Sequence, residues 1–205
     1  MKTFIVTPET APSVEGPRQG EWTYADWELV GADDENRYEV IDGVLYMTTA
    51  PKNFHQWIIS RLIKYVGFPA EDQESAHFFV APIGVLMPGC DPVQPDFLII
   101  LEENIGIIHD GRIRGAPDLI VEVLSPGTRD YDEGVKLEAY AHAGMPEYVV
   151  IDPRERKLRL YTLEEAGVYA KPHEFEADER VKFACLPSIE FRLSALFEGA
   201  PDTTV

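Results

Sequence analysis

Residues 115–130 read GAPDLIVEVLSPGTRD, and residues 147–152 read EYVVID. The run at 119–124 is apolar on both faces apart from one acid, which is the pattern of a central strand covered on both sides. A helix is expected between the two segments, from about 128 to 143, because a glycine and a proline follow in the order that ends helices. Strand, helix, strand predicts a crossover unit with two parallel strands, so the fold class is α/β with a mixed sheet.

Further elements flank this unit on both sides. RYEVIDGVLYM at 37–47 places two β-rich runs around Asp-Gly at 42–43, a strong hairpin signal. Apolar spacing predicts a short helix over 24–31 and a longer helix over 53–66, which the glycine and proline that follow are expected to end. Additional strands are expected at 77–86, 96–101, 157–163, 168–171 and 181–183, irregular loops at 88–95 and 104–117, and a helical turn at 193–197.

The length of 205 residues is typical of one domain. Prolines without a periodic apolar pattern predict a flexible N-terminal arm at 1–20, followed by a single domain at 21–198 and a C-terminal tail at 199–205. The first residues lack a signal-peptide core, and the longest apolar run, FLIIL, is too short to cross a membrane. Two cysteines are too few for a disulfide framework, so we expect a cytoplasmic protein without a membrane partner.

The charge of the chain is strongly acidic. It has 18 basic and 36 acidic residues, a formal net charge of −18 at pH 7. Such a chain repels phosphate polyanions at long range, which disfavours DNA as a partner. Binding DNA would require basic residues to gather on one face, and the candidates are Lys52, Arg61, Lys64, Arg112, Arg114 and Arg129.

Glu122 is the one ionisable residue inside LIVEVL. Burying a charged carboxylate there costs free energy unless a cation or hydrogen-bond donors compensate. Strand alternation places Asp118 on the same face, but about 13 Å away at about 3.3 Å per residue, too far to share an ion. Asp96 opens a separate strand, and neighbouring strands lie about 4.8 Å apart. Asp96 and Glu122 could therefore share a hard divalent cation.

Each of these acids also has a purely structural interpretation. A Pro-Asp pair at a strand entrance, as at Asp96 and Asp118, can satisfy a turn amide. Glu122 can pair with an arginine or with Lys136, which lies at the margin of its helix's buried face. The ordinary interpretation of Lys136 is a surface ion pair with Asp132.

Glu39 and His55 have equally plain alternatives. Glu39 fits the exposed half of an alternating hairpin. His55 aligns with apolar residues of its helix, which is typical of a histidine satisfied within a core. The other histidines show no metal-ligand spacing, and the sequence contains neither a nucleophile elbow nor a Walker loop.

Several of these residues lie in or near short motifs. Along the chain these are Glu39 in EVIDG, His55, Asp96 in QPD, Asp118 and Glu122 in GAPDLIVEVLSP, then Asp132, Lys136, Tyr140 and EYVVIDP. This order resembles the Uma-two family of the PD-(D/E)xK nuclease superfamily. The similarity covers about 22–197 and is most specific over 115–153.

The resemblance implies a restriction-endonuclease-like fold, which is a mixed sheet with flanking helices. It also implies an enzyme that uses Mg²⁺ or Mn²⁺ to hydrolyse phosphodiester bonds of DNA. It implies that Asp96 and Glu122 bind the metal and that Glu39 supports the site. The superfamily places a lysine two residues after the strand acid, where this chain has Leu124, so Lys136 is the nearest replacement and completes the catalytic set. The supporting candidates are His55, Asp118, Asp132 and Tyr140.

Two other functions stay open at this point. The chain could be a non-catalytic interaction or assembly module that keeps the fold and holds its acids in structural ion pairs. It could also be a metal-dependent hydrolase of a small phosphate ester, which suits the net charge better. Exposed sheet edges, together with the superfamily resemblance, lead us to expect a homodimer.

Overall fold

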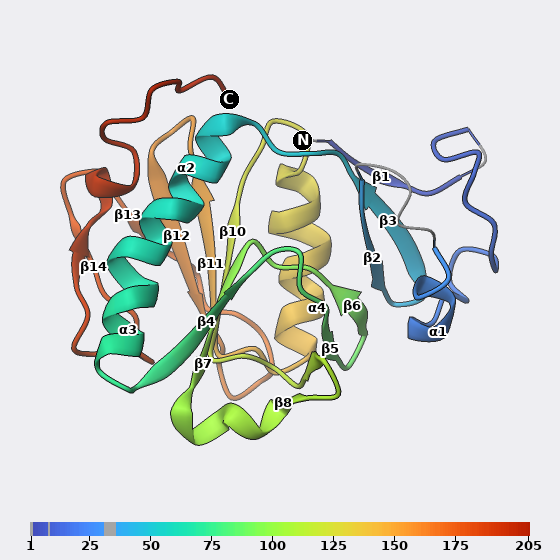
Figure 1. Ribbon diagram of the computed structural model, residues 1–205, viewed down its shortest axis with the longest axis horizontal. Coiled ribbons are helices and arrows are strands. Elements are labelled where there is room, and N and C mark those ends of the chain that lie inside the picture. The colour runs from blue at the N-terminus through green and yellow to red at the C-terminus, as the bar shows by residue number, and fades with distance from the viewer. Residues whose placement is uncertain (1, 8, 31–35) are drawn as a thin grey trace.

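The computed structural model describes residues 2–7, 9–30 and 36–205. Within these ranges the strands form a six-stranded sheet, a seven-stranded sheet and a two-stranded ribbon, here the first sheet, the second sheet and the ribbon. Helices cover both faces of the first sheet (Figure 1). This arrangement confirms the predicted α/β class with a mixed sheet and flanking helices.

The first sheet is built around the two apolar segments that were predicted as parallel strands, 119–124 and 147–152. Its spatial order is β13 (His173–Phe175), β12 (Lys157–Thr162), β11 (Glu147–Asp152), β10 (Leu119–Val123), β7 (Phe97–Leu101) and β4 (Ala76–Val80). β10 runs parallel to β11, as predicted, and antiparallel to β7. Every residue of β10 and β11 is buried, because both faces of these strands are covered.

The second sheet contains the predicted hairpin. Its order is β1 (Thr3–Ile5), β3 (Val44–Thr48), β2 (Arg37–Ile41), β6 (Cys90–Val93), β5 (Val85–Met87), β9 (Arg112–Arg114) and β8 (Ile108–His109). Asp42 and Gly43 join β2 to β3 with φ angles of 49° and 72°, the left-handed pair that a tight hairpin turn requires. The ribbon consists of β14 (Arg180–Val181) and β15 (Phe191–Arg192).

Two helical segments cover the first sheet. α2 (Asn53–Leu62), the π-helical turn η1 (Ile63–Gly67) and α3 (Phe68–Asp72) pack with the C-terminal part of the chain on one face. The π-helical turn η3 (Tyr131–Val135) and α4 (Lys136–His142) pack on the other face, together with side chains from the second sheet. The remaining helices are α1 (Tyr24–Trp27) and the 3₁₀ turns η2 (Glu102–Ile107) and η4 (Leu193–Leu196).

The prediction that Gly67 and Pro69 end the long helix is wrong, because helical structure continues to Asp72. The π-helical turn shifts the hydrogen-bond pattern just before Pro69, so the amide that proline lacks costs little there. A Cβ atom on Gly67 would lie 2.8 Å from the ring of Phe78. This glycine therefore serves close packing against β4 and does not terminate the helix.

Other boundaries differ from the predictions. The expected loop at 88–95 contains β6, and the expected loop at 104–117 contains β8 and β9. Pairing at 168–171 is confined to an isolated bridge between Leu163 and Tyr169. The final residue of the helix expected over 24–31 lies outside the described residues, and α1 ends at Trp27.

The inward side of α4 includes its lysine. Lys136, expected at the margin of the buried face of its helix, is itself buried, as are Ala139, Tyr140 and Ala141, whereas Leu137 is only partly buried. The helix is thus rotated so that its lysine faces inward. This rotation follows from the π-helical turn, whose extra residue changes the phase of the side chains that come after it.

Described residues of the N-terminal segment contact the second sheet and the loop after β10. β1 pairs with β3, and the amide of Thr3 donates to the carbonyl of Gly127 over 3.2 Å. Val6 and Ala11 are buried in a cluster that also contains Trp22. Among the described residues, no helix combines the length and the apolar character needed to cross a membrane.

Candidate active site

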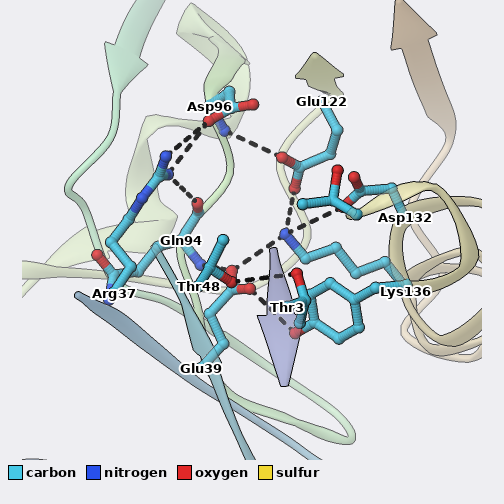
Figure 2. Close-up of a pocket in the computed structure, with 11 residues that line it drawn as sticks. Thr3, Arg37, Glu39, Thr48, Gln94, Asp96, Glu122, Asp132 and Lys136 are labelled. Atoms are coloured by element: carbon cyan, nitrogen blue, oxygen red, sulfur yellow. Dashed lines mark hydrogen bonds and ion pairs between the residues drawn. The ribbon is translucent and has the colours of Figure 1, made fainter. Parts of the chain in front are cut away.

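A polar pocket lies where β1, β2 and β3 meet β10 and the start of α4 (Figure 2). Four carboxylates and two cationic side chains line it among the described residues. Three threonines, a glutamine and a tyrosine complete its wall. The lining residues are Thr3, Arg37, Glu39, Thr48, Gln94, Asp96, Glu122, Thr128, Tyr131, Asp132 and Lys136.

Glu122 projects from the middle of β10 toward α4 and is only 3% exposed. Its Oε1 accepts from Lys136 Nζ at 2.8 Å and from the Tyr140 hydroxyl at 3.1 Å. Its Oε2 accepts from the backbone amide of Asp96 at 3.4 Å. Burial raises the pKa of Glu122 to about 8, although the ammonium of Lys136 acts in the opposite direction.

Asp96 stands at the entrance of β7, next to Glu122. The pairing of Phe97 with Val121 continues the strand register to these two acids, which confirms that they lie on neighbouring strands. Asp96 Oδ2 accepts from the amide of Val123 at 3.0 Å and contacts His55 Nε2 at 2.9 Å.

The second oxygen of Asp96 belongs to an ion pair. Its Oδ1 accepts from Nη1 and Nη2 of Arg37, at 3.1 and 3.2 Å. Burial favours the protonated acid, but His55, Arg37 and the Val123 amide outweigh it and hold the pKa of Asp96 below its usual range. Asp96 is therefore ionised at neutral pH.

Lys136 lies between three of the carboxylates. Its Nζ is 2.8 Å from Glu122 Oε1, 3.1 Å from Glu39 Oε1 and 3.8 Å from Asp132 Oδ1. Burial alone would lower the pKa of Lys136, but these carboxylates raise it above its ordinary value. The interpretation of Lys136 and Asp132 as a surface pair is wrong, since both side chains are buried.

Glu39 is also buried, at 3% exposure, so the interpretation as the exposed half of the hairpin is wrong. Its Oε1 accepts from the amide of Gln94 at 2.6 Å, and its Oε2 accepts from the Tyr131 hydroxyl at 3.0 Å. The π-helical turn and the loop before β7 thereby fix this carboxylate against Lys136.

Asp132 enters the pocket from η3. Burial raises its pKa to about 7, while Lys136 and a hydrogen bond with Thr128 act in the opposite direction. Tyr140, one turn after Lys136 on α4, contacts the same oxygen of Glu122 as the lysine does. α4 therefore supplies both side-chain donors to this oxygen.

The fold brings together seven of the eight residues singled out in the sequence: Glu39, His55, Asp96, Glu122, Asp132, Lys136 and Tyr140. Asp118 is the exception, because it does not line the pocket. It accepts from the amide of Leu101 at 2.8 Å and from Asn104 Nδ2 at 2.7 Å. Its contacts are those of a structural acid at the entrance of β10.

Arg37 and Tyr131 are pocket residues that the sequence reasoning missed. Strand alternation places Arg37 on the same face of β2 as Glu39, which is a usable signal once Glu39 is known to face inward. Tyr131 carried no comparable signal. Its position depends on the π-helical turn, which local sequence does not reveal.

The donor set suits a hard divalent cation. With every acid ionised, the four carboxylates exceed the two cationic side chains of the pocket by two formal charges. No group of three His, Cys, Asp or Glu side chains in the described ranges is spaced to hold a metal. Mg²⁺ needs fewer protein ligands, because it keeps several waters and often uses one or two carboxylates. Asp96 and Glu122, on neighbouring strands, could supply those carboxylates.

Three comparisons relate the chain to known proteins. Residues 23–195 match the sequence model of the Uma2 family, described as "Putative restriction endonuclease". An uncharacterised protein of Synechocystis sp. (strain ATCC 27184 / PCC 6803 / Kazusa) is 30% identical over 84 residues, which make up 40% of this chain and 43% of that protein. The aligned part thus spans less than half of that relative.

The fold also has a solved counterpart. The crystal structure of "a putative nuclease belonging to DUF820" from Anabaena variabilis ATCC 29413 superimposes with a TM-score of 0.72 at 20% identity. The match covers 86% of this chain and 97% of that chain, and it shows that the two proteins share a fold. The description of the family supports a nuclease-type function. Because the family model spans most of the sequence, the chain belongs to the Uma2 family of restriction-endonuclease-like proteins.

Proposed function

We propose that the protein is a divalent-metal-dependent endonuclease that hydrolyses phosphodiester bonds of DNA. The observation that carries the proposal is the side-by-side placement of Asp96 and Glu122 on neighbouring strands, with Lys136 Nζ 2.8 Å from Glu122. Two carboxylates on neighbouring strands can hold a metal ion for phosphodiester hydrolysis, and the lysine contacts one of them, Glu122. Membership of the Uma2 family supports the same chemistry.

Asp96 and Glu122 would hold Mg²⁺ or Mn²⁺. When bound, such an ion polarises a phosphoryl oxygen and lowers the pKa of an attacking water. Asp96 is already ionised, because His55, Arg37 and the Val123 amide lower its pKa. His55 acts as a positioning residue, since it fixes Asp96 Oδ2 from the side of α2.

Lys136 supplies a fixed positive charge beside the metal-binding carboxylates. It can stabilise the negative charge that develops on the phosphoryl group, or it can orient the attacking water. Glu39, itself fixed by Gln94 and Tyr131, holds the ammonium from the opposite side at 3.1 Å. In this proposal Lys136 takes the role that the superfamily assigns to a lysine at the position of Leu124.

The test is cleavage of a supercoiled plasmid with Mg²⁺ or Mn²⁺. The wild-type protein should nick and linearise the plasmid, and Glu122→Gln should not. Asp118→Asn is the matched control, because it removes a buried acid from the same stretch of chain outside the pocket. Equal cleavage by the wild type and Glu122→Gln would contradict the proposal. Hydrolysis of p-nitrophenyl phosphate without plasmid cleavage would instead identify a small-ester hydrolase.

A second candidate is the non-catalytic interaction module. It is favoured by one observation: Glu39, Asp96 and Glu122 each accept hydrogen bonds from protein groups and contact a cationic side chain. A module of this kind should bind no Mn²⁺, and its stability should not change with the metal. A rise in melting temperature with Mn²⁺ that Glu122→Gln abolishes would exclude the module.

Homodimer formation is a separate proposal, which rests on the edge strands of the sheets. Among the described residues, β4 and β13 are the edge strands of the first sheet, and an edge strand can pair with a strand of another chain. Light scattering after size exclusion would show a mass of about twice 23.1 kDa if the proposal is right. A single species at the monomer mass would contradict it.

A further inference from the structure

Arg37 is the most exposed of the charged side chains that line the pocket. It begins β2, and its side chain is 19% exposed, compared with 5% for Lys136 and 4% for Asp96. Figure 2 shows its guanidinium pointing at Asp96 from the side opposite Glu122. The two cationic side chains of the pocket therefore differ in accessibility, and Arg37 is the one an incoming anion meets first.

The ion pair between Arg37 and Asp96 has an unusual pattern. Both Nη1 and Nη2 donate to the same oxygen, Oδ1, and Nη1 also donates to the carbonyl of Gln94 at 3.3 Å. The strongest arginine–carboxylate pairs instead use two parallel hydrogen bonds to two oxygens. Here the second oxygen, Oδ2, is taken by His55 and the Val123 amide. Asp96 therefore offers the guanidinium of Arg37 one of its two oxygens.

The two oxygens of Asp96 differ in how firmly their donors are held. Oδ2 contacts a buried histidine and a backbone amide of the central strand, and neither can leave without moving α2 or β10. Oδ1 contacts the end of a long side chain that is partly exposed. A divalent cation would therefore take Oδ1, because a hard cation needs a carboxylate oxygen whose lone pairs can be freed.

We propose that Arg37 is an exchangeable counter-ion that also binds the substrate. Without a divalent cation it neutralises Asp96. Once Oδ1 is engaged by the cation, the guanidinium turns to a non-bridging oxygen pair of the substrate phosphate, which matches its fork better than one carboxylate oxygen does. This inference rests on the proposed nuclease function and assigns to Arg37 the contact with the phosphate.

The exchange accounts for a difficulty of charge. The chain carries a formal net charge of −18 and has to bring a polyanion to a pocket lined by four carboxylates. A cation that binds Asp96 and displaces Arg37 has two effects. It adds positive charge to the pocket, and it leaves the guanidinium able to contact the phosphate. Metal and DNA should therefore bind with positive coupling, and the coupling should depend on Arg37.

The metal half of the proposal is tested by Mn²⁺ binding, measured by electron paramagnetic resonance without DNA. Arg37→Met keeps the length of the side chain but removes the competitor for Oδ1, so Mn²⁺ should bind roughly tenfold more tightly than to the wild type. Arg37→Lys should stay near the wild type. Arg129→Met is the matched control, because it removes an arginine from the buried Asp152 outside the pocket, and it should leave Mn²⁺ affinity unchanged.

The phosphate half is tested by fluorescence anisotropy with a labelled DNA duplex, in Ca²⁺ and in EDTA. Wild-type protein should bind the duplex more tightly in Ca²⁺ than in EDTA, by roughly tenfold or more. Arg37→Met should lose most of this difference although it binds the metal better. Arg37→Lys should lose part of it, because an ammonium cannot make the paired contact of a guanidinium. Circular dichroism of each variant shows that the fold is retained.

Two results would overturn the proposal: Mn²⁺ affinity of Arg37→Met that is equal to or weaker than that of the wild type, or DNA affinity in Ca²⁺ that Arg37→Met leaves unchanged. Both can occur while the wild type still cleaves plasmid, in which case the nuclease function stands and the role of Arg37 falls. Conversely, tighter Mn²⁺ binding and lost DNA coupling in a protein that cleaves nothing would support the exchange and reject the nuclease.

Discussion

Lys136 Nζ lies 2.8 Å from Oε1 of Glu122, although the two residues belong to different elements and are separated by a loop and a π-helical turn. The contact places a lysine beside the strand acid without a lysine on the strand itself. Position 124, two residues after that acid, holds a buried leucine that packs in the core. The lysine beside Glu122 therefore comes from the helix.

Replacing Lys136 should abolish cleavage and destabilise the fold. Lys136→Met leaves Glu39, Glu122 and Asp132 buried without their shared cation, which should cost about 3–5 kcal/mol of unfolding free energy at pH 8. The loss should be smaller at pH 5, because acids with raised pKa values take up protons there. Urea unfolding at the two pH values measures both effects, and equal losses would contradict the account.

Asp132 should make the stability of the protein depend on pH. Its pKa is raised to about 7 in the folded state, so the unfolded chain releases the proton first as the pH rises. The stabilisation by the protonated form is complete below the unfolded pKa of about 3.9 and is lost as the pH rises through about 7. Asp132→Asn should therefore gain roughly 1–3 kcal/mol over the wild type at pH 8 but not at pH 4. Thermal melts at both pH values test the sign, and a gain that does not change with pH would show another cause.

His55 should act on metal binding through Asp96. His55→Phe keeps the packing under α2 but removes the contact to Asp96 Oδ2, so the carboxylate becomes less well oriented. Affinity for Mn²⁺ should fall roughly 10- to 100-fold, as for other second-layer contacts to metal ligands. His77→Phe is the control, since His77 pairs with Glu102 on the surface. Equal Mn²⁺ affinity of both variants would remove His55 from the site.

Gly67 and Gly134 both lie in π-helical turns, and alanine at the two positions should affect stability differently. A methyl group on Gly67 would meet the ring of Phe78, so Gly67→Ala should lose about 1–3 kcal/mol of unfolding free energy. Gly134 has no neighbour within 4 Å of such a methyl group, so Gly134→Ala should be neutral or gain up to about 1 kcal/mol. Chemical denaturation of both variants tests whether Gly67 serves packing, and similar values would refute that reason.

Much of the central architecture could be predicted from local sequence. The apolar run around Glu122 and the strand at 147–152 predicted two buried parallel strands, because a strand covered on both faces has no polar alternation. Asp-Gly at 42–43 predicted the hairpin, because both residues tolerate positive φ angles. The same reasoning placed Asp96 and Glu122 on neighbouring strands, since an acid inside an apolar strand needs a nearby partner.

The tertiary structure alone decided which side chains surround those acids. Glu39 and Lys136 are 97 positions apart in the chain, and nothing in either local pattern shows that they meet at 3.1 Å. Arg37 and Lys136 reach the same pocket from the second sheet and from α4, and a π-helical turn precedes the lysine in the chain. Alternation and spacing describe one element at a time, whereas contacts between elements depend on how their faces pack, which is a property of the whole chain.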